Sequence, residues 1–149
     1  MLKKKTYRVR LWKKLILIIL FSFNTFGGSN EIYYYDQEAI SLTGKIETQT
    51  FPGPPNYESI KNGDSIEKCW FLKLEKPIDV LSISKEEKNR DDPAFNVRIV
   101  QLAIQNDLLW DKIKKGKKVR VKGTLYHRQN GHHHSKVLIH TSGLEVLNE

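Results

Sequence analysis

The sequence predicts a mainly β protein: a small five-stranded barrel of the OB type, with Greek-key connections and one short helix between the third and fourth strands. Segments that alternate apolar and polar residues recur along the chain, which is typical of half-buried strands. One segment of helical spacing stands between the third and fourth of them. Glycines interrupt the first and fourth, where a sheet that closes into a barrel must bend sharply. An antiparallel sandwich would fit the same strand pattern.

The start of the chain has the layout of a secretory signal. Residues 1–28 contain seven basic and no acidic side chains, and an apolar run covers residues 15–21. A basic segment, a short apolar run and then small residues are typical of a cleaved signal peptide. The run is shorter than the about 20 residues that a membrane-spanning helix needs. We therefore expect residues 29–149 to form one exported domain, periplasmic or secreted, with an uncleaved anchor at residues 7–26 as the alternative.

Most of the net charge belongs to this signal. The 149 residues include 25 Lys and Arg against 17 Asp and Glu, a formal charge of +8. Without the seven basic residues of the signal, 18 basic residues face 17 acidic ones, a net charge of +1. A nearly neutral domain gives no general indication of nucleic-acid binding. The single cysteine excludes an internal disulfide and a zinc site made of cysteines alone.

The first two strands flank a long proline-rich connection. Residues 40–50 alternate as a strand that Gly44 interrupts, and residues 51–57, with three prolines, end it. Residues 62–64, Asn-Gly-Asp, are a strong turn signal. Residues 66–75 then alternate with one clearly apolar face. We expect this to be the second barrel strand.

The second strand is expected to end at a proline. Pro77 removes a backbone donor, so it should break the strand or place it at an edge, with residues 78–83 as a short extension. Residues 84–93 form a charged loop without periodicity. Residues 95–104 resume the alternation and become apolar on both faces near their end, which is typical of a central strand.

The predicted helix of about ten residues follows the third strand. Asn106 is a good N-cap, and Gly116 can supply a left-handed C-terminal cap. Between them Leu109, Trp110 and Ile113 fall on one stripe at helical spacing.

The last two strands complete the barrel. Residues 117–128 alternate cleanly, with Gly123 on the inward-facing row. Residues 129–131, Gln-Asn-Gly, form a turn that leads through three histidines to a last strand at residues 136–147. Ser-Gly at residues 142–143 should bend or bulge that strand.

Several short segments of the chain together form a recognisable pattern. They are Phe51–Glu58, Gly63-Asp64, Gln101-Leu102, Gly123–Tyr126, Gly131–His134 and Val137–Ile139. This pattern resembles an exported bacterial family, domain of unknown function 4431. The resemblance implies an envelope or secreted protein and supplies no reaction, ligand or catalytic residue. Where family members have Thr before the Gly-His-His segment and Pro after it, this chain has Asn130 and Ser135.

Two unusual loops are expected to form a recognition patch. OB folds bind ligands with the loop between strands one and two, the loop between strands four and five, and the face between them. The proline-rich and histidine-rich segments occupy these two positions, so they should lie at the same end of the barrel. The expected binding residues are Asn56, Tyr57, Asp64, His132 and His134. In the structural alternative, the prolines stiffen the loop and Tyr57 caps the core.

The histidines also allow a metal site. Imidazole is the commonest transition-metal ligand, and alternate residues of an extended segment point to one face. A site for zinc or copper would use His127, His132 and His134. The sequence places no Asp or Glu clearly to orient these rings. In the alternative, the histidines form a polar hairpin that hydrogen-bonds to the proline-rich loop.

Two further features carry less functional information. Residues 112–122 contain seven basic side chains, a local patch that a solvated outer face and the helix dipole would explain. An OB fold that binds single strands also needs stacking aromatics, for which Phe71 and Tyr126 are available, but an exported protein meets little nucleic acid. Cys69, alone on a strand, is expected to be a small packed residue.

The sequence contains no recognisable catalytic constellation. The function we expect is an exported, noncatalytic OB-like module that binds a protein or a glycan of the cell envelope without a cofactor. It would contact the membrane only through an uncleaved signal segment. The alternative is a histidine-dependent metal-binding protein or metal-assisted hydrolase.

Overall fold

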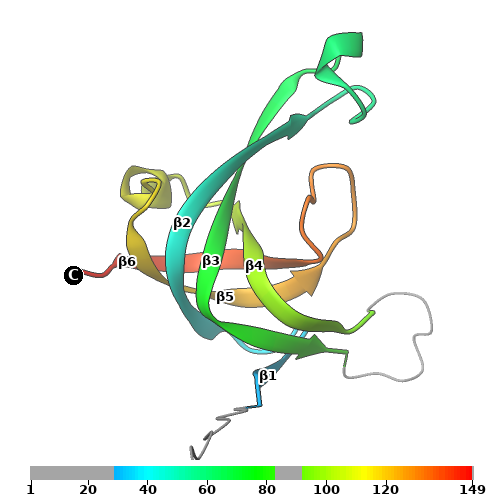
Figure 1. The fold of residues 1–149 in the computed structure, drawn as a ribbon. Coiled ribbons are helices and arrows are strands. Elements are labelled where there is room, and N and C mark those ends of the chain that lie inside the picture. Colours follow the sequence, from blue (N-terminus) through cyan, green and yellow to red (C-terminus); the bar gives the residue numbers. More distant parts are fainter. Residues whose placement is uncertain (1–28, 83–91, 149) are drawn as a thin grey trace, which may run out of the picture.

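Six strands and two short 3-10 helices make up most of the described chain (Figure 1). The structure, a computed structural model, describes residues 29–82 and 92–148, so the predicted signal at residues 1–28 lies outside the described residues. The strands are β1 Glu31–Tyr34, β2 Ile40–Pro52, β3 Ile66–Leu81, β4 Ala94–Ile104, β5 Lys118–His127 and β6 Val137–Val146. Within the described part of the chain, no helix is both long and apolar enough to cross a membrane.

Five of the strands close into a barrel. β2 pairs antiparallel with β3 and β5, β3 pairs antiparallel with β4, β4 pairs parallel with β6, and β6 pairs antiparallel with β5. The ring therefore runs β2-β3-β4-β6-β5 and returns to β2. This is a closed five-stranded Greek-key barrel of the OB type. The fold class that the sequence predicts is confirmed.

Two glycines let the barrel bend where the sequence predicts. A Cβ on Gly44 would overlap the carbonyl oxygen of Lys73 on β3, and a Cβ on Gly123 would overlap that of His140 on β6. The neighbouring strand therefore approaches too closely for a side chain at either position. The predicted bulge in the last strand is also present, because Ser142 is an extra residue between the β5–β6 pairs of Thr141 and Gly143.

β1 was not expected from the sequence. This strand of four residues pairs parallel with the end of β3, from Glu31 opposite Ile78 to Tyr34 opposite Leu81. Asn30 strengthens the contact by donating from its side-chain amide to the carboxylate of Asp79, at 2.8 Å. Four residues are too few to show a clear alternation, and a strand beside the barrel does not need two buried faces.

The predicted strand extension after Pro77 is present, but the strand is not broken at the proline, because β3 continues through it to Leu81. The pairing of β2 with β3 ends at Leu74, and the pairing of β3 with β4 shifts register between Lys73 and Ile78. Pro77 thus lies where the ladder is already irregular, so its missing N–H costs little.

The predicted helix is present between β4 and β5, but it is shorter than the about ten residues expected. It is a 3-10 helix, η2 (Asp107–Lys112), which Asn106 caps as predicted by accepting from the backbone N–H of Leu108 at 3.0 Å. Leu109 is buried in the barrel core. Soon afterwards the backbone N–H of Gly116 donates to the carbonyl of Ile46 at 2.7 Å, which returns the chain to the sheet before a longer helix can form.

β3 has two different faces. Trp70, Leu72 and Leu74 belong to the barrel core or pack against it. The alternate residues Cys69 and Phe71 are also buried, but they lie outside that core cluster. They therefore face a second buried layer on the outer side of the sheet, beneath the loops that carry the candidate site.

Candidate functional site

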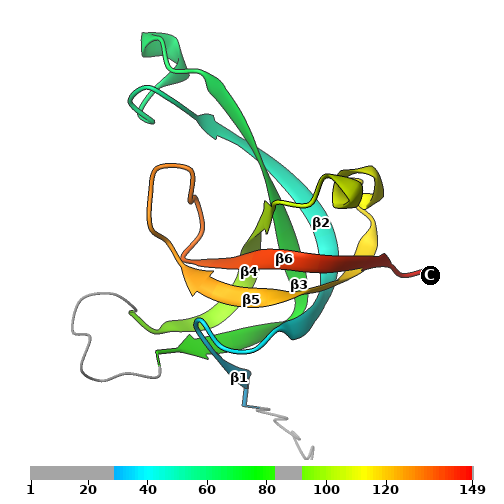
Figure 2. The ribbon, with the colours of Figure 1, turned by 180° about the vertical axis from the view of Figure 1, so that it is seen from behind.

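Two loops meet at one end of the barrel. The proline-rich loop (residues 53–65) joins β2 to β3 and contains the 3-10 helix η1 (Ile60–Asn62), and the histidine loop (residues 128–136) joins β5 to β6. Figure 1 shows the β2–β3 hairpin extending beyond the barrel, and Figure 2 shows the histidine loop rising from the same end. These are the loops in which OB folds carry their ligand sites.

The loops are joined by Tyr57 and His132. The hydroxyl of Tyr57 lies 2.8 Å from Nε2 of His132, and the two rings are nearly perpendicular with centroids 5.0 Å apart. Gly131 allows this approach, because a Cβ there would stand 3.0 Å from the Tyr57 ring. The structure therefore brings together these two predicted binding residues. Tyr57 contacts the histidine loop, which differs from the alternative in which it caps the core.

Asp64 holds the proline-rich loop in shape. Its carboxylate accepts hydrogen bonds from the backbone N–H groups of Asn56, Glu58 and Ser59, at 2.8–2.9 Å, and from the side-chain amide of Asn56 at 3.1 Å. The hydrogen bond from Ser59 is the main cause that keeps the pKa of Asp64 below its usual value; burial opposes it, and the other hydrogen bonds add to it. Asp64 and Asn56 therefore bind each other within the loop, and Asp64 is buried away from solvent.

This arrangement predicts a stability change at acid pH. A carboxyl whose pKa is lower in the folded than in the unfolded chain stabilises the fold above its usual pKa of 3.8. That contribution is lost as the pH falls through the folded-state value. Asp64→Asn should therefore melt below the wild type at pH 7, and the difference should shrink as the pH falls below 3.8. Melting temperatures of the two proteins across a pH series measure the difference at pH 7 and its decrease at acid pH.

A matched variant in the same loop controls for the loss of a negative charge. The side chain of Glu58 takes no part in the four hydrogen bonds to Asp64, so Glu58→Gln should melt like the wild type across the series. A constant difference between Asp64→Asn and the wild type at every pH would contradict the role of the Asp64 carboxylate.

Gln101 of β4 holds the histidine loop. Its side-chain amide donates to the carbonyl of His132 at 2.7 Å, and its side-chain oxygen accepts from the backbone N–H groups of His134 at 2.6 Å and Ser135 at 3.2 Å. Gln101 is itself buried, so these contacts are shielded from water. They fix the course of the loop and therefore the direction of its rings.

Glu67 is the acidic centre of the site. One carboxylate oxygen lies 2.8 Å from Nδ1 of His132, and the other lies 3.4 Å from Nε2 of His134. Because the carboxylate accepts, Nδ1 of His132 donates, and in the neutral ring Nε2 is left to accept from the hydroxyl of Tyr57. The ring of His134 stacks on Phe51, with centroids 3.9 Å apart and planes 2° from parallel.

The site shifts the pKa of two groups on β3. Partial burial alone would raise the pKa of Glu67, but the hydrogen bonds and charges of His132 and His134 outweigh it, so this pKa lies below its usual value. Burial raises the pKa of the Cys69 thiol to about 11, and the Glu67 carboxylate adds to the rise. Cys69 is therefore a protonated, packed thiol at neutral pH, as the sequence predicts, and not an activated nucleophile.

The predicted trio of metal-binding histidines is not assembled. His127 pairs with Val137 at the base of the histidine loop, and its ring meets Tyr35 edge-on. Gln101 instead turns residues 132–134 toward β3. Among the described residues, the metal-ligand atoms that do cluster belong to Glu67, Cys69 and His134, and they all lie within 4.8 Å of one another.

Glu67 is the central residue of the candidate site, and the sequence did not reveal it. It lies two positions before Cys69 on the outer row of β3, next to the predicted loop. Strand alternation could have placed it on the same face as Cys69, but nothing in the spacing indicated that the histidines would reach that face.

A groove opens beside this cluster, where two strands separate. The pairing of β3 with β4 ends where Phe71 lies opposite Gln101. On the loop side of this pair, β3 is paired only with β2, and β4 is paired only with β6. The groove has a volume of about 260 Å³. Its lining includes Glu67, Lys68, Cys69, Trp70, Trp110 and His132. The rings of Trp70 and Trp110 meet edge-on at 6.4 Å, and the Lys68 ammonium lies 4.8 Å from the centre of the Trp70 ring.

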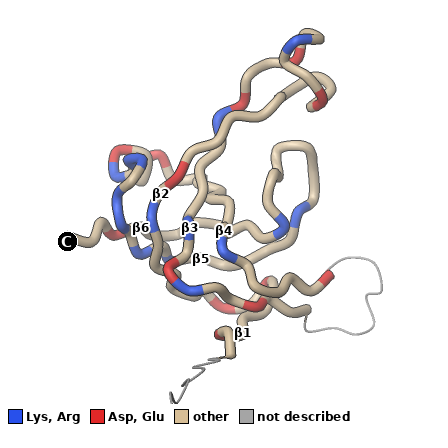
Figure 3. The backbone as a smooth tube through the Cα atoms, viewed as in Figure 1, with Lys and Arg blue, Asp and Glu red and all other residues tan. Residues whose placement is uncertain are grey.

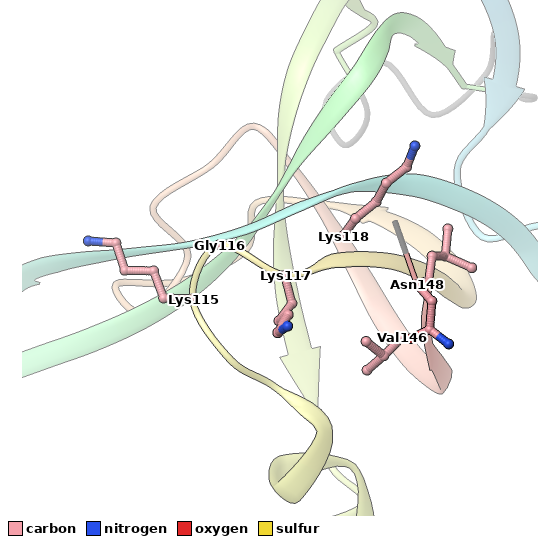
Figure 4. Close-up of a pocket in the computed structure, with 7 residues that line it drawn as sticks. Lys115, Gly116, Lys117, Lys118, Val146 and Asn148 are labelled. Atoms are coloured by element: carbon pink, nitrogen blue, oxygen red, sulfur yellow. The ribbon is translucent and has the colours of Figure 1, made fainter.

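The basic patch at residues 112–122 lies elsewhere. Figure 3 shows basic residues beside the C-terminal end, whereas the histidine loop is basic only at its base. A cavity of about 450 Å³ is lined by residues 115–118 and 146–148, none of them aromatic. In Figure 4 the side chains of Lys115 and Lys118 point away from each other. Lys118 also pairs with Glu75 at 2.6 Å. This surface therefore lacks the stacking rings of single-strand binding sites.

A family comparison supports the expected resemblance. Residues 99–145 match the family model described as Domain of unknown function (DUF4431). Over this segment the chain is similar to the DUF4431 family. The DUF4431 segment runs from within β4 into β6 and contains Gln101 and the whole histidine loop. The proline-rich loop and Glu67 lie outside it. No curated protein and no solved structure matches the chain.

Proposed function

We propose that this protein is an exported, noncatalytic OB-type module that binds a protein or glycan partner in the cell envelope. The observation that carries the proposal is the groove between β3 and β4, beside the joined proline-rich and histidine loops. Ligands of OB barrels bind at this position. The export part rests on the basic and apolar pattern of residues 1–28.

The chemistry of the groove favours a glycan. Trp70 and Trp110 offer aromatic surface, and the amide, imidazole and carboxylate groups around them offer donors and acceptors for hydroxyls. The charge of Lys68 is balanced by Glu67, so the groove has no excess of positive charge for a phosphate backbone. These properties fit a neutral oligosaccharide better than a nucleic acid.

A protein partner is the second form of the proposal. Ile60 and Ile66 are exposed near the tip of the β2–β3 hairpin, with 42% and 69% of their surfaces accessible. Exposed apolar side chains close to a groove are suited to a protein contact.

Tryptophan fluorescence can test the glycan form directly. The chain has three tryptophans, and Trp12→Phe leaves the two that line the groove. Adding soluble, uncharged oligosaccharides of N-acetylglucosamine to this variant should shift the emission with a saturable dependence on concentration. Trp110→Ala should weaken binding about tenfold, because a stacking ring in a groove contributes about 1–2 kcal/mol.

Phe95→Ala is the matched control. Phe95 is an exposed aromatic residue of β4, 66% accessible, that does not line the groove. Its loss should leave glycan binding unchanged. Equal losses for Phe95→Ala and Trp110→Ala would contradict the role of the groove.

Site-specific crosslinking separates the two forms of the proposal. A photo-crosslinking amino acid at position 110 should capture its partner in the intact envelope, whereas the same group at position 95 should not. A captured protein, with no emission shift on addition of the oligosaccharides, would support the protein form. No capture and no emission shift would contradict both.

A further inference from the structure

We propose that Glu67, Cys69 and His134 bind a divalent transition-metal ion, with Zn²⁺ as the preferred ion. This ligand set differs from a site made of histidines alone, because it joins two residues of β3 to one residue of the histidine loop. It is also independent of whether the groove binds a glycan or a protein.

The spacing of the ligand atoms is close to what the ion needs. A carboxylate oxygen of Glu67, the Sγ of Cys69 and a ring nitrogen of His134 all lie within 4.8 Å of one another. Zinc bonds of 2.0–2.3 Å in a tetrahedral site place ligand atoms about 3.3–3.8 Å apart. The distance from Glu67 Oε2 to His134 Nε2 is already 3.4 Å. Small side-chain movements would therefore complete the site without moving the backbone.

The donor atoms select the class of ion. Thiolate sulfur, imidazole nitrogen and carboxylate oxygen are all common zinc ligands. The ion would displace the proton that the Cys69 thiol carries at neutral pH, so zinc binding would release a proton to solvent. Mg²⁺ and Ca²⁺ prefer oxygen ligands alone, so the thiol of Cys69 and the ring of His134 disfavour them. Three protein ligands leave one coordination position open, and two of these ligands, Glu67 and Cys69, line the groove.

Surrounding residues hold the ligands in place before any ion binds. The ring of His134 lies flat against Phe51, and its backbone N–H is bound by Gln101. The other carboxylate oxygen of Glu67 accepts from His132, which is held by Tyr57. Such outer contacts orient ligands at metal sites and raise their affinity.

Metal uptake by the purified full chain, kept reduced, tests the proposal. After removal of metal with a chelator, titration calorimetry should show one Zn²⁺ bound per chain. Co²⁺ in place of Zn²⁺ should give a near-ultraviolet thiolate-to-cobalt charge-transfer band, which reports the Cys69 ligand without any substitution. Absence of uptake, or bound Co²⁺ without this band, would overturn the proposal.

Ligand variants then test two of the three ligand positions, Cys69 and His134. Cys69→Ser and His134→Gln should each weaken Zn²⁺ binding at least about 100-fold, more than is typical for loss of an outer contact. His127→Gln and His140→Gln should bind like the wild type, because these rings pack against Tyr35 and Tyr126 instead. Unchanged affinity in both ligand variants, or an equal loss in His127→Gln, would refute the assignment.

A folding control keeps the result interpretable. Melting curves of the metal-free variants should match the metal-free wild type within a few degrees, and added Zn²⁺ should raise the melting temperature of the wild type but not of Cys69→Ser. If Cys69→Ser fails to fold, the proposal is tested by the Zn²⁺ affinity of His134→Gln and by the cobalt spectrum of the unsubstituted chain. If the protein binds Zn²⁺ but no glycan, that result would contradict the glycan form of the proposed function and leave the metal site supported.

Discussion

Replacing Gly123 by alanine should destabilise the barrel more than any other single methyl group placed on β5 or β6. The new Cβ would overlap the carbonyl oxygen of His140 and press on the side chain of Ile139. The obstacle is largely backbone, so the strands themselves must separate. We expect a loss of about 3 kcal/mol, the upper part of the range for overpacking and a large fraction of a typical domain stability.

Gly143 offers the same substitution in the partner strand. A Cβ there would lie 3.6 Å from Lys122, which is an ordinary contact. Gly143→Ala should therefore stay within about 1 kcal/mol of the wild type. Urea unfolding of the two variants measures the difference, and equal destabilisation would contradict the requirement for close approach at Gly123.

Replacing Gln101 by leucine should release the histidine loop. The substitution keeps a side chain of similar size but leaves the carbonyl of His132 and the backbone N–H groups of His134 and Ser135 without their buried partner. Unsatisfied groups of this kind cost about 1–3 kcal/mol each, and partial access to water should limit the total to about 2–4 kcal/mol. Besides lowering the free energy of unfolding, the substitution should loosen both loops, because Tyr57 of the proline-rich loop contacts His132 of the histidine loop.

Hydrogen exchange measures the local part of the effect. The N–H groups of His134 and Ser135 should lose protection from exchange in Gln101→Leu. The N–H groups of the β2–β5 ladder should stay protected under conditions in which most molecules remain folded. Gln105→Leu is the control, since Gln105 is exposed and lies one residue beyond the end of β4. Unchanged protection of the loop in Gln101→Leu would show that Gln101 does not hold it.

The barrel could be predicted because its strands obey a local rule. Alternation over eight or more residues reports a strand with one buried face, and a glycine within such a run reports a bend. β1 escaped prediction because four residues carry too little pattern. The effect of Pro77 and the length of η2 were misjudged because both depend on contacts with residues distant in sequence. A register shift between β3 and β4 accommodates the proline, and the hydrogen bond of Gly116 to Ile46 limits the helix.

The candidate site could be predicted only in outline. Loop order in an OB barrel was sufficient to bring Tyr57 and His132 to one end. Which side chains contact each other within the site could not be predicted, because Glu67 and His132 are 65 residues apart in sequence. Their meeting depends on the register of the β2–β3 hairpin and on the buried amide of Gln101, and neither leaves a local signal.

The strand order also sets when the site can exist during synthesis. β2, β3 and β4 leave the ribosome first and can form a meander, but its outer edges, on β2 and β4, wait for β5 and β6. The histidine loop lies between those last two strands. A shortened chain would therefore carry Glu67, Cys69 and the proline-rich loop without the rings that complete them. The complete face, with both loops and Glu67 together, is therefore a property of the finished chain.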